Sequence, residues 1–118
     1  MSRDWRMYLD DIVQGCDKIR RFTRTMKAEE FRSDEKTYDA VLRNLEIIGE
    51  AAKHVPQSVR EEMPDVAWRK VAGLRDMIAH AYFGIDDDIV WDIVSNRVPE
   101  LQQAVEGFLT GLDEYPPR

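Results

Sequence analysis

The sequence predicts an all-α fold, an antiparallel bundle of four main helices with short helical turns between them. Apolar residues recur at three-and-four spacing along most of the chain, which is the period of one helix face. No run of alternating polar and apolar residues is long enough to be a convincing strand. The 118 residues, 43% of them hydrophobic, can bury a sizeable core, so we expect residues 1–118 to form a single domain.

Two long helices are expected in the N-terminal half. The first carries an apolar stripe made of Trp5, Leu9, Ile12, Cys16, Ile19 and Met26. Ser33 is a candidate N-cap for the second helix, because acidic residues follow it directly. The stripe of that second helix runs from Tyr38 to Val55. Gly49 lies inside it at some cost in helix propensity, and we interpret this glycine as a close approach of another helix.

Two more helices are expected in the C-terminal half, after a short helix opened by Pro56. Asp65 is a candidate N-cap for the third main helix, and Gly84 is a candidate for its left-handed C-terminal cap.

The last main helix is predicted to begin at the acidic run 86–88, since carboxylates favour the positive end of a helix. Pro99 lies within it and should kink it near Val98. Residues 115–118 are expected to form a frayed tail.

The charge is negative overall and unevenly distributed. A net charge of -6 argues against a general nucleic-acid coating protein, whose affinity would depend on many phosphate contacts. Residues 1–27 nevertheless hold seven Lys/Arg against four Asp/Glu, and the remainder holds ten against nineteen. The basic excess comes from "KIRRFTRTMK", in which Arg20, Arg24 and Lys27 share one helical flank. This strip is either a solvated face or a surface that meets a polyanion or an acidic partner.

Cellular location is inferred from the cysteine content and the apolar runs. The single cysteine, Cys16, excludes an internal disulfide, fits a reducing cytoplasm, and falls on an apolar stripe as a core thiol. No apolar run approaches the roughly 20 residues that cross a membrane. The N-terminus is charged from the start and lacks the apolar region of a signal peptide. We therefore expect a cytoplasmic protein without membrane contact.

The stretch "LRDMIAHAYFGID" places unusual polar groups on a mostly apolar helix. At about 100° per residue, Arg75 and Tyr82 project with the apolar stripe that contains Val71. Asp76 and His80 lie one turn apart on another flank, and Arg75 and His80 point about 140° apart. An arginine on the inward side has to be paired, or to face a cleft or a partner subunit, because an unpaired buried charge is very costly.

The residue types in this stretch admit a structural and a chemical interpretation. Arg75 could belong to a structural ion pair, His80 could be a surface residue, and Tyr82 could lie at the core edge. Chemically, Asp76 at i, i+4 can orient the His80 imidazole, which titrates near neutral pH and can move a proton. Arg75 can neutralise charge that grows on phosphate oxygens. Phosphoryl transfer or RNA cleavage would fit, and neither a metal nor another cofactor is needed.

The second helix offers polar partners for this stretch. Arg43, Glu46 and Glu50 share one face of it, and the two acids could pair with Arg75 across the bundle. Glu50 and His54 are spaced i, i+4 and could hold a cation together with His80. The chain has no H-E-x-x-H sequence and no cysteine cluster, so we predict no metal site.

The segments around this stretch resemble the HepT-like branch of the HEPN superfamily. The hallmark of the superfamily is an Arg, four residues, a His, one residue and a Tyr, which here is Arg75, "DMIA", His80, Ala81 and Tyr82. The segments "RNLEIIGEAAKHVP", "WRKVAGLRD", "YFGID" and "W...VPEL" look like that branch in the same order. Asp76 stands where Asn is usual.

The resemblance implies a fold and an activity. The fold would be a HEPN-type helical bundle that forms a homodimer, with the motif helices lining a cleft between subunits. The activity would be metal-independent endoribonuclease cleavage of RNA, as the toxin of a bacterial toxin–antitoxin pair. Arg75 would bind phosphate, His80 would transfer the proton, and Asp76 would support the site.

The resemblance also implies a regulatory partner. A minimal nucleotidyltransferase antitoxin of the MntA type would silence the toxin by AMPylation of the motif tyrosine, Tyr82. The alternative is a non-catalytic HEPN helical module that binds a nucleotidyltransferase partner or a nucleotide and cleaves nothing.

Overall fold

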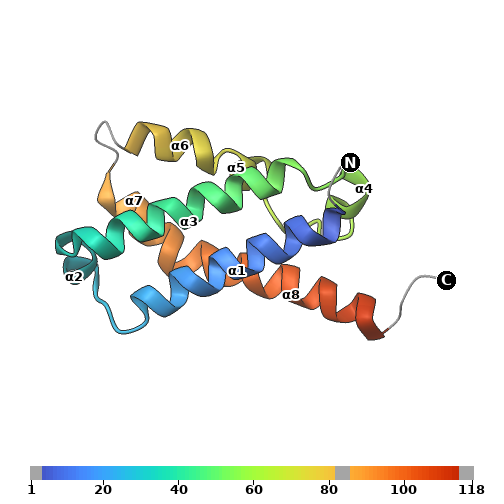
Figure 1. Ribbon diagram of the computed structural model, residues 1–118, viewed down its shortest axis with the longest axis horizontal. Coiled ribbons are helices and arrows are strands. Elements are labelled where there is room, and N and C mark those ends of the chain that lie inside the picture. The colour runs from blue at the N-terminus through green and yellow to red at the C-terminus, as the bar shows by residue number, and fades with distance from the viewer. Residues whose placement is uncertain (1–3, 82–85, 115–118) are drawn as a thin grey trace.

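Long helices that alternate in direction build the protein. The computed structural model describes residues 4–81 and 86–114. Its main helices are α1 (Trp5–Thr23), α3 (Glu35–Lys53), α6 (Leu74–Ala81) and α8 (Val98–Glu114). α1 lies antiparallel to both α3 and α8, and α6 runs antiparallel to α3 on the far side from α1 (Figure 1). No strand occurs in the described ranges, and the predicted all-α antiparallel bundle is confirmed.

Short helical segments join the long ones. They are α2 (Ala28–Ser33), α4 (Gln57–Arg60), α5 (Trp68–Ala72), α7 (Asp87–Asp92) and the π-helical turn η1 (Ile93–Arg97). α4 follows Pro56 as predicted. Arg60 of α4 folds back on the end of α3 and donates to the carbonyl oxygens of Val55, at 2.9 Å, and Ala52, at 2.6 Å. A cation at the carbonyl end of a helix donates to otherwise unpaired carbonyl oxygens and interacts favourably with the negative end of the helix dipole.

The first connection differs from the prediction. α1 begins after Asp4, whose carboxylate accepts from the Arg6 amide at 3.0 Å, and it ends at Thr23, before Met26. Ser33 is not the N-cap of the second long helix but the last residue of α2. Asp34 takes that place and accepts from the Thr37 amide at 3.0 Å. A carboxylate one residue later replaces the predicted hydroxyl, because residues 28–33 form a helical turn of their own.

The third main helix is divided. Ala67, not Asp65, precedes α5, and Gly73 separates α5 from α6. The Gly73 amide donates to the Arg69 carbonyl at 3.0 Å, so the chain turns without leaving its backbone unpaired. The predicted cap at Gly84 and the predicted tail at 115–118 lie outside the described residues.

The interruption expected at Pro99 is a π-helical turn. A proline lacks the amide that would donate to the carbonyl four residues earlier, here that of Ser95. The chain widens over Ile93–Arg97 instead, and the Val98 amide donates to the Ile93 carbonyl, five residues back. The last helical segment begins at the acidic run, as predicted: the Asp86 carboxylate precedes α7 and accepts from the Asp88 amide at 2.9 Å.

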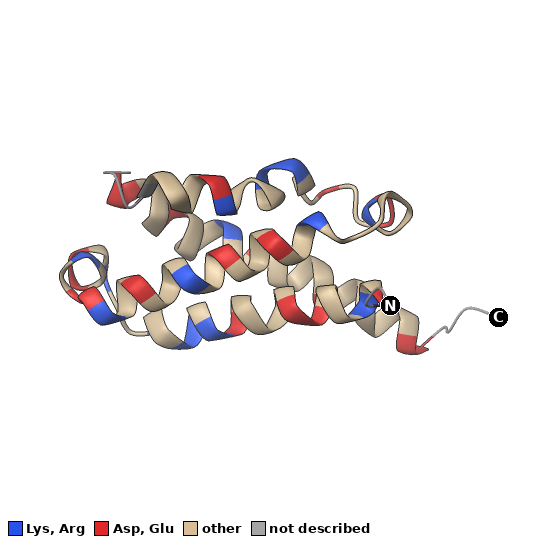
Figure 2. Cartoon of the chain, turned by 45° about the horizontal axis from the view of Figure 1, so that its top comes forward, with Lys and Arg blue, Asp and Glu red and all other residues tan. Residues whose placement is uncertain are grey.

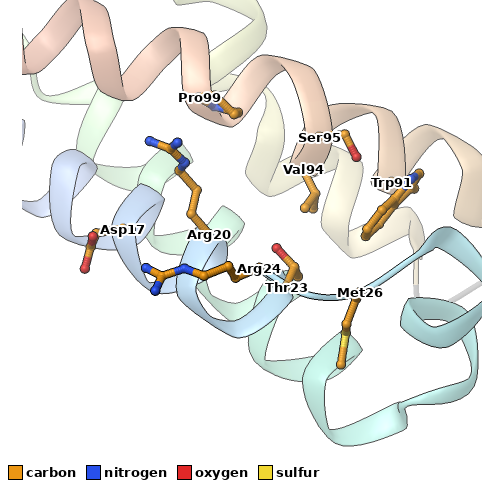
Figure 3. A pocket seen from close by; sticks show the side chains of 9 residues that line it. All are labelled: Asp17, Arg20, Thr23, Arg24, Met26, Trp91, Val94, Ser95 and Pro99. Carbon is orange, nitrogen blue, oxygen red and sulfur yellow. The ribbon is translucent and has the colours of Figure 1, made fainter.

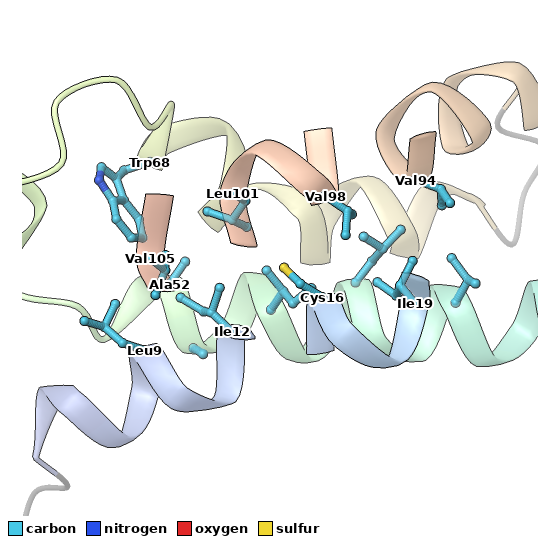
Figure 4. Packing of buried hydrophobic residues seen from close by; sticks show 14 of the residues in the cluster. Leu9, Ile12, Cys16, Ile19, Ala52, Trp68, Val94, Val98, Leu101 and Val105 are labelled. Carbon is cyan, nitrogen blue, oxygen red and sulfur yellow. The ribbon is translucent and has the colours of Figure 1, made fainter. Parts of the chain in front are cut away.

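The core lies where α1, α3 and α8 meet (Figure 4). Each of these helices contributes one stripe of buried side chains: Leu9, Ile12, Cys16 and Ile19 from α1, Val41, Leu42, Leu45, Ile48 and Ala52 from α3, and Val98, Leu101 and Val105 from α8. Burying one such aliphatic side chain contributes roughly 1.5–3 kcal/mol to folding. Burial, reinforced by the charge of Glu106, also raises the pKa of Cys16 to about 12, so this residue is an unreactive core thiol.

Gly49 is the point at which α3 meets the α5–α6 junction. A Cβ atom there would lie 2.9 Å from the Arg75 amide nitrogen, 3.2 Å from Leu74 Cβ and 3.3 Å from the Val71 carbonyl oxygen. The interpretation of Gly49 as a close approach is correct. Only a residue without a side chain allows the start of α6 to lie directly on α3. None of the described helices combines the length and the apolar character needed to span a membrane.

We predict that Gly49→Ala lowers the midpoint of thermal unfolding. The new methyl group meets backbone atoms that cannot rotate away, and overpacking of this kind costs about 1–3 kcal/mol. Gly107→Ala is the matched control, because nothing lies within 4 Å of a Cβ there and alanine favours the helix. It should raise the midpoint. Circular dichroism of both variants tests this, and a Gly49→Ala protein as stable as Gly107→Ala would contradict the assigned contact.

Candidate active site

The polar motif lies on the outer surface of α6, and α3 carries that helix. Ile78, at 1% exposure, packs into the core, whereas Arg75, Asp76 and His80 are exposed. The close contact at Gly49 sets the start of α6, one residue before Arg75. The helix is therefore held by its apolar face, and its charged and polar groups face outward.

Arg75 forms an ion pair with α3. Its Nη1 donates to Glu50 Oε2 at 2.7 Å, and the two side chains are 53% and 46% exposed. The prediction that Arg75 projects inward is wrong for the guanidinium, although its backbone lies against α3. The predicted direction assumed one continuous helix from Val71 onward, at about 100° per residue. The break between α5 and α6 at Gly73 means that Val71 and Arg75 do not belong to one continuous helix. The long side chain then reaches outward along α3, where water and Glu50 solvate the charge.

Glu50 lies between two basic groups. Its Oε1 is 3.6 Å from His54 Nε2, while Oε2 accepts from Arg75. Partial desolvation opposes ionisation of this carboxyl, but the hydrogen bond and charge of Arg75, aided by Lys53 and His54, hold its pKa below the ordinary 4.5. His54 stacks on Tyr8 of α1, with ring centroids 4.8 Å apart and planes 18° apart. A row of Arg75, Glu50 and His54 thus lies along the surface.

Asp76 and His80 are not joined. They occupy i, i+4 positions on α6, but no hydrogen bond or ion pair links these two described side chains. Both are open to solvent and free to turn toward a ligand. The orienting role predicted for Asp76 is therefore not formed in this single chain.

Of the two acids on α3 that were predicted to pair with Arg75, Glu46 does not reach it. Arg43 and Glu46 pair with each other, with Nη1 and Oε2 3.5 Å apart. These residues lie one and two turns before Glu50 on the helix, so only Glu50 is level with the start of α6. Tyr82, the predicted site of modification, lies outside the described residues. Across the described ranges, no group of three His, Cys, Asp or Glu side chains is placed to hold a metal ion.

Tyr8 is the neighbour that sequence reasoning missed. It brings α1 to the end of the polar row through its contact with His54. Helical periodicity places Tyr8 only on a flank of α1, and no local signal connects it to a histidine 46 residues away. His54 itself was considered only as a metal ligand, and here its nearest polar partner is Glu50.

Two hollows of the described surface lie elsewhere, and neither is lined by Arg75, Asp76 or His80. The larger, about 750 Å³, separates α5 and α6 from η1 and α8, and Leu74, Met77 and Ile93 give it a mainly apolar wall. The smaller lies between α1 and η1–α8. The motif is thus displayed on an exposed helix surface, outside both of these hollows.

The arrangement can bind an anion and move a proton, but at separate places. Arg75 offers a guanidinium that is held by one exposed carboxylate, and His80 offers an imidazole. Five residues apart on a helix, their Cα atoms differ by about 7.5 Å along the axis and by about 140° around it. One phosphate cannot easily meet both groups on the same α6. A second motif helix facing this one would bring an arginine and a histidine together.

An all-α bundle with an Arg/His motif on a surface helix is the class that fold and site define, and the comparisons agree. The family described as "Ribonuclease HepT-like" matches residues 12–108. A Thermococcus cleftensis protein named "Probable ribonuclease HepT" is 42% identical, covering 90% of this chain and 96% of its own. A Methanocaldococcus jannaschii protein named "Putative RNase" is 41% identical, covering 95% and 93%. No solved structure gave a significant match. The chain belongs to the HepT-like ribonuclease family.

We predict that Arg75→Gln raises the pKa of the Glu50 carboxyl toward 4.5. The guanidinium supplies the strongest influence that lowers this pKa, and glutamine removes its charge. In the wild type the ion pair is complete above the ordinary glutamate pKa and is lost as the pH falls through the lowered value. NMR titration of the Glu50 carboxyl carbon measures the change. Arg69→Gln, an exposed arginine on α5, is the control and should leave the titration unchanged.

Proposed function

We propose that this protein is a metal-independent endoribonuclease and the toxin of a toxin–antitoxin pair. The observation that carries the proposal is the motif on α6, where Arg75 and His80 are both exposed and α3 anchors the helix beneath them. Membership of the HepT-like ribonuclease family and relatives named as ribonucleases support it. An arginine and a histidine are the groups that phosphate-ester cleavage needs when no metal takes part.

In the proposed reaction the ribose 2′-oxygen attacks the adjacent phosphorus. His80 accepts the 2′-hydroxyl proton, the bond from phosphorus to the 5′-oxygen breaks, and the proton passes from His80 through water to that leaving oxygen. The products are a 2′,3′-cyclic phosphate and a 5′-hydroxyl end. Arg75 binds the phosphate and stabilises the negative charge that grows on its oxygens. Asp76, one turn from His80, supports the charged imidazole once a ligand draws the two side chains together.

Glu50 gives this site a resting state. Its carboxylate occupies Arg75 at 2.7 Å, in the position that a substrate phosphate would take. Because both side chains are about half exposed, the pair is weak enough to exchange one anion for another. Glu50 then remains near His54, which keeps its charge partly balanced.

The site is completed in a homodimer. On one chain Arg75 and His80 point apart, and neither lines either of the two hollows described above. Two α6 helices packed around a twofold axis would place Arg75 of one subunit opposite His80 of the other, because such an interface repeats the same patch. The apolar hollow beside α6, about 750 Å³ in volume, offers adjoining surface that association could bury.

The partner that silences the toxin is a minimal nucleotidyltransferase antitoxin that transfers AMP from ATP to Tyr82. The Tyr82 oxygen attacks the α-phosphorus, and pyrophosphate leaves. An AMP group two residues from His80 adds a bulky anion to a site built for phosphate. It would compete for Arg75 and repel RNA.

We predict that Arg75→Ala and His80→Ala each reduce RNA cleavage at least a hundredfold with the fold intact. Each change removes one group that acts on the reacting phosphate, and losses of this size are typical of such groups. Gel analysis of labelled single-stranded RNA in EDTA measures the rate, and a 2′,3′-cyclic phosphate should end one product. Arg69→Ala, which removes an equal charge from neighbouring α5, should cleave like the wild type.

Equal cleavage by both motif variants and the wild type would refute the nuclease assignment. Absence of cleavage in the wild type, together with binding of a nucleotidyltransferase, would leave the non-catalytic helical module as the function.

We predict that co-expression with its nucleotidyltransferase increases the intact mass of the wild-type chain by one or more AMP groups. The Tyr82→Phe chain lacks the accepting oxygen, so its mass should not change and its RNA cleavage should persist. Tyr38→Phe is the matched control and should still be modified, because the Tyr38 hydroxyl is engaged with Asp87 at 2.9 Å. Full neutralisation of the Tyr82→Phe protein without any added mass would exclude this form of regulation.

A further inference from the structure

The smaller of the two hollows, away from α6, lies between the C-terminal half of α1 and the η1–α8 junction. Its volume is about 450 Å³, and its lining includes Asp17, Arg20, Thr23, Arg24, Trp91 and Ser95 (Figure 3). Arg20 of α1 and Arg24, the C-cap residue directly after that helix, supply two guanidinium groups to one side, and α7 and η1 supply an aromatic ring and a hydroxyl to the other. None of these residues belongs to the site on α6.

The positive charge of this hollow is not neutralised by its surroundings. Arg20 Nη1 donates to the neutral Gln102 Oε1 at 3.1 Å, and Arg24 makes no hydrogen bond or ion pair with any described residue. Asp17 is the one acidic side chain in the lining, and Arg21 engages it at 2.9 Å. Arg20 and Arg24, one helical turn apart and both exposed, are therefore available to an anion from outside.

The charge around the hollow directs a polyanion to this place. Residues 18–27 contain five Lys/Arg and no Asp/Glu, although the whole chain carries a net charge of -6. Figure 2 shows basic positions gathered on the C-terminal half of α1 and acidic ones on its N-terminal half. A strand of phosphates is repelled by most of such a surface and attracted here. Lys27, which the sequence grouped with this strip, lies beyond the end of α1 and does not line the hollow.

The opposite wall fits a nucleobase. Trp91 is half-buried, and its ring is fixed against Phe31, with centroids 5.1 Å apart. Ser95 is exposed and keeps its hydroxyl available, whereas the Thr23 hydroxyl is used by the Ile19 carbonyl at 2.8 Å. Cations on one side and a held aromatic ring on the other are the pair of features by which proteins bind single-stranded nucleic acid. The volume is within the range of small-ligand pockets.

We propose that this hollow binds one nucleotide unit of single-stranded RNA outside the cleavage site. The phosphate lies on Arg20 and Arg24, and the base packs against Trp91 while Ser95 supplies a hydrogen bond. The inference rests on the proposed function, since it takes RNA as the substrate, and it assigns the strand a second point of attachment. An acidic protein segment would use the two cations but would gain nothing from an aromatic wall, so the observations favour RNA.

Binding is tested on the full-length protein with His80→Ala, so that the RNA stays intact. Fluorescence anisotropy with a labelled single-stranded oligoribonucleotide compares the double variant Arg20→Gln, Arg24→Gln with Arg21→Gln. The double variant should bind at least tenfold more weakly, and its slope of log affinity against log salt should fall by about 1.4, the value for two lost phosphate contacts on a single strand. Arg21→Gln, held by Asp17 on the same helix, should change affinity less than threefold.

Two competitors distinguish the sources of the same chemistry. Excess 5′-AMP should displace the oligonucleotide only weakly, because a strand also engages neighbouring cations. Displacement by AMP and oligonucleotide at equal concentrations would overturn the strand assignment in favour of a mononucleotide site. Binding of polyglutamate with loss of RNA binding would overturn it in favour of an acidic protein partner. Equal affinity of the double variant and Arg21→Gln would remove the hollow from RNA binding altogether.

Cleavage by the protein with His80 intact separates this proposal from the function on which it rests. The double variant should have a KM several-fold higher and an unchanged kcat, because the hollow holds the strand and does not touch the reacting phosphate. If the double variant cleaves RNA with an unchanged KM, the proposal that the hollow binds RNA fails and the nuclease assignment is retained. If the wild type does not cleave RNA but the double variant still loses RNA affinity, the nuclease assignment fails and the proposal that the hollow binds RNA is retained.

Discussion

The contact between α3 and the start of α6 is the constraint on which the candidate site depends. α6 has eight residues and reaches the core through few side chains, Ile78 chief among them, so its own propensity cannot hold it in place. Gly49 removes the one side chain that would separate the two helices. The backbone at Arg75 then lies on α3, and the guanidinium is within reach of Glu50. Position and charge balance of the motif follow from that single approach.

The two basic features of the protein solve the same electrostatic problem in different ways. Arg75 is paired with the Glu50 carboxylate, and in the proposed reaction a substrate phosphate would exchange with that carboxylate. Arg20 donates to the neutral amide of Gln102, and Arg24 has no hydrogen-bond or ion-pair partner among the described residues. The positive potential of these two arginines therefore extends into the solvent. Under the proposals made above the two features have different tasks: Arg20 and Arg24 attract the strand, and Arg75 binds the phosphate that displaces Glu50.

Periodicity was a good guide to the core and a poor one to the connections. The buried stripes of α1 and α3 are the ones that three-and-four spacing indicates, because burial of apolar surface outweighs other terms there. The predicted caps at Ser33 and Asp65 were wrong, since neighbouring residues compete for one cap and local energies differ by only about 1 kcal/mol. The predicted inward direction of Arg75 was wrong because it assumed one continuous helix, whereas Gly73 separates α5 from α6.

The sequence by itself determined the class of fold and the family, and it indicated candidate residues for the chemistry, because residue type and spacing along one helix are local properties. It also marked Gly49, since a glycine inside a helix has a cost that a close contact explains. Only the tertiary structure decided which of the two acids on α3 pairs with Arg75, that Tyr8 stacks on His54, and that Trp91 and Ser95 line the same hollow as Arg20 and Arg24. These pairings join residues far apart in the chain, and packing of whole helices sets them.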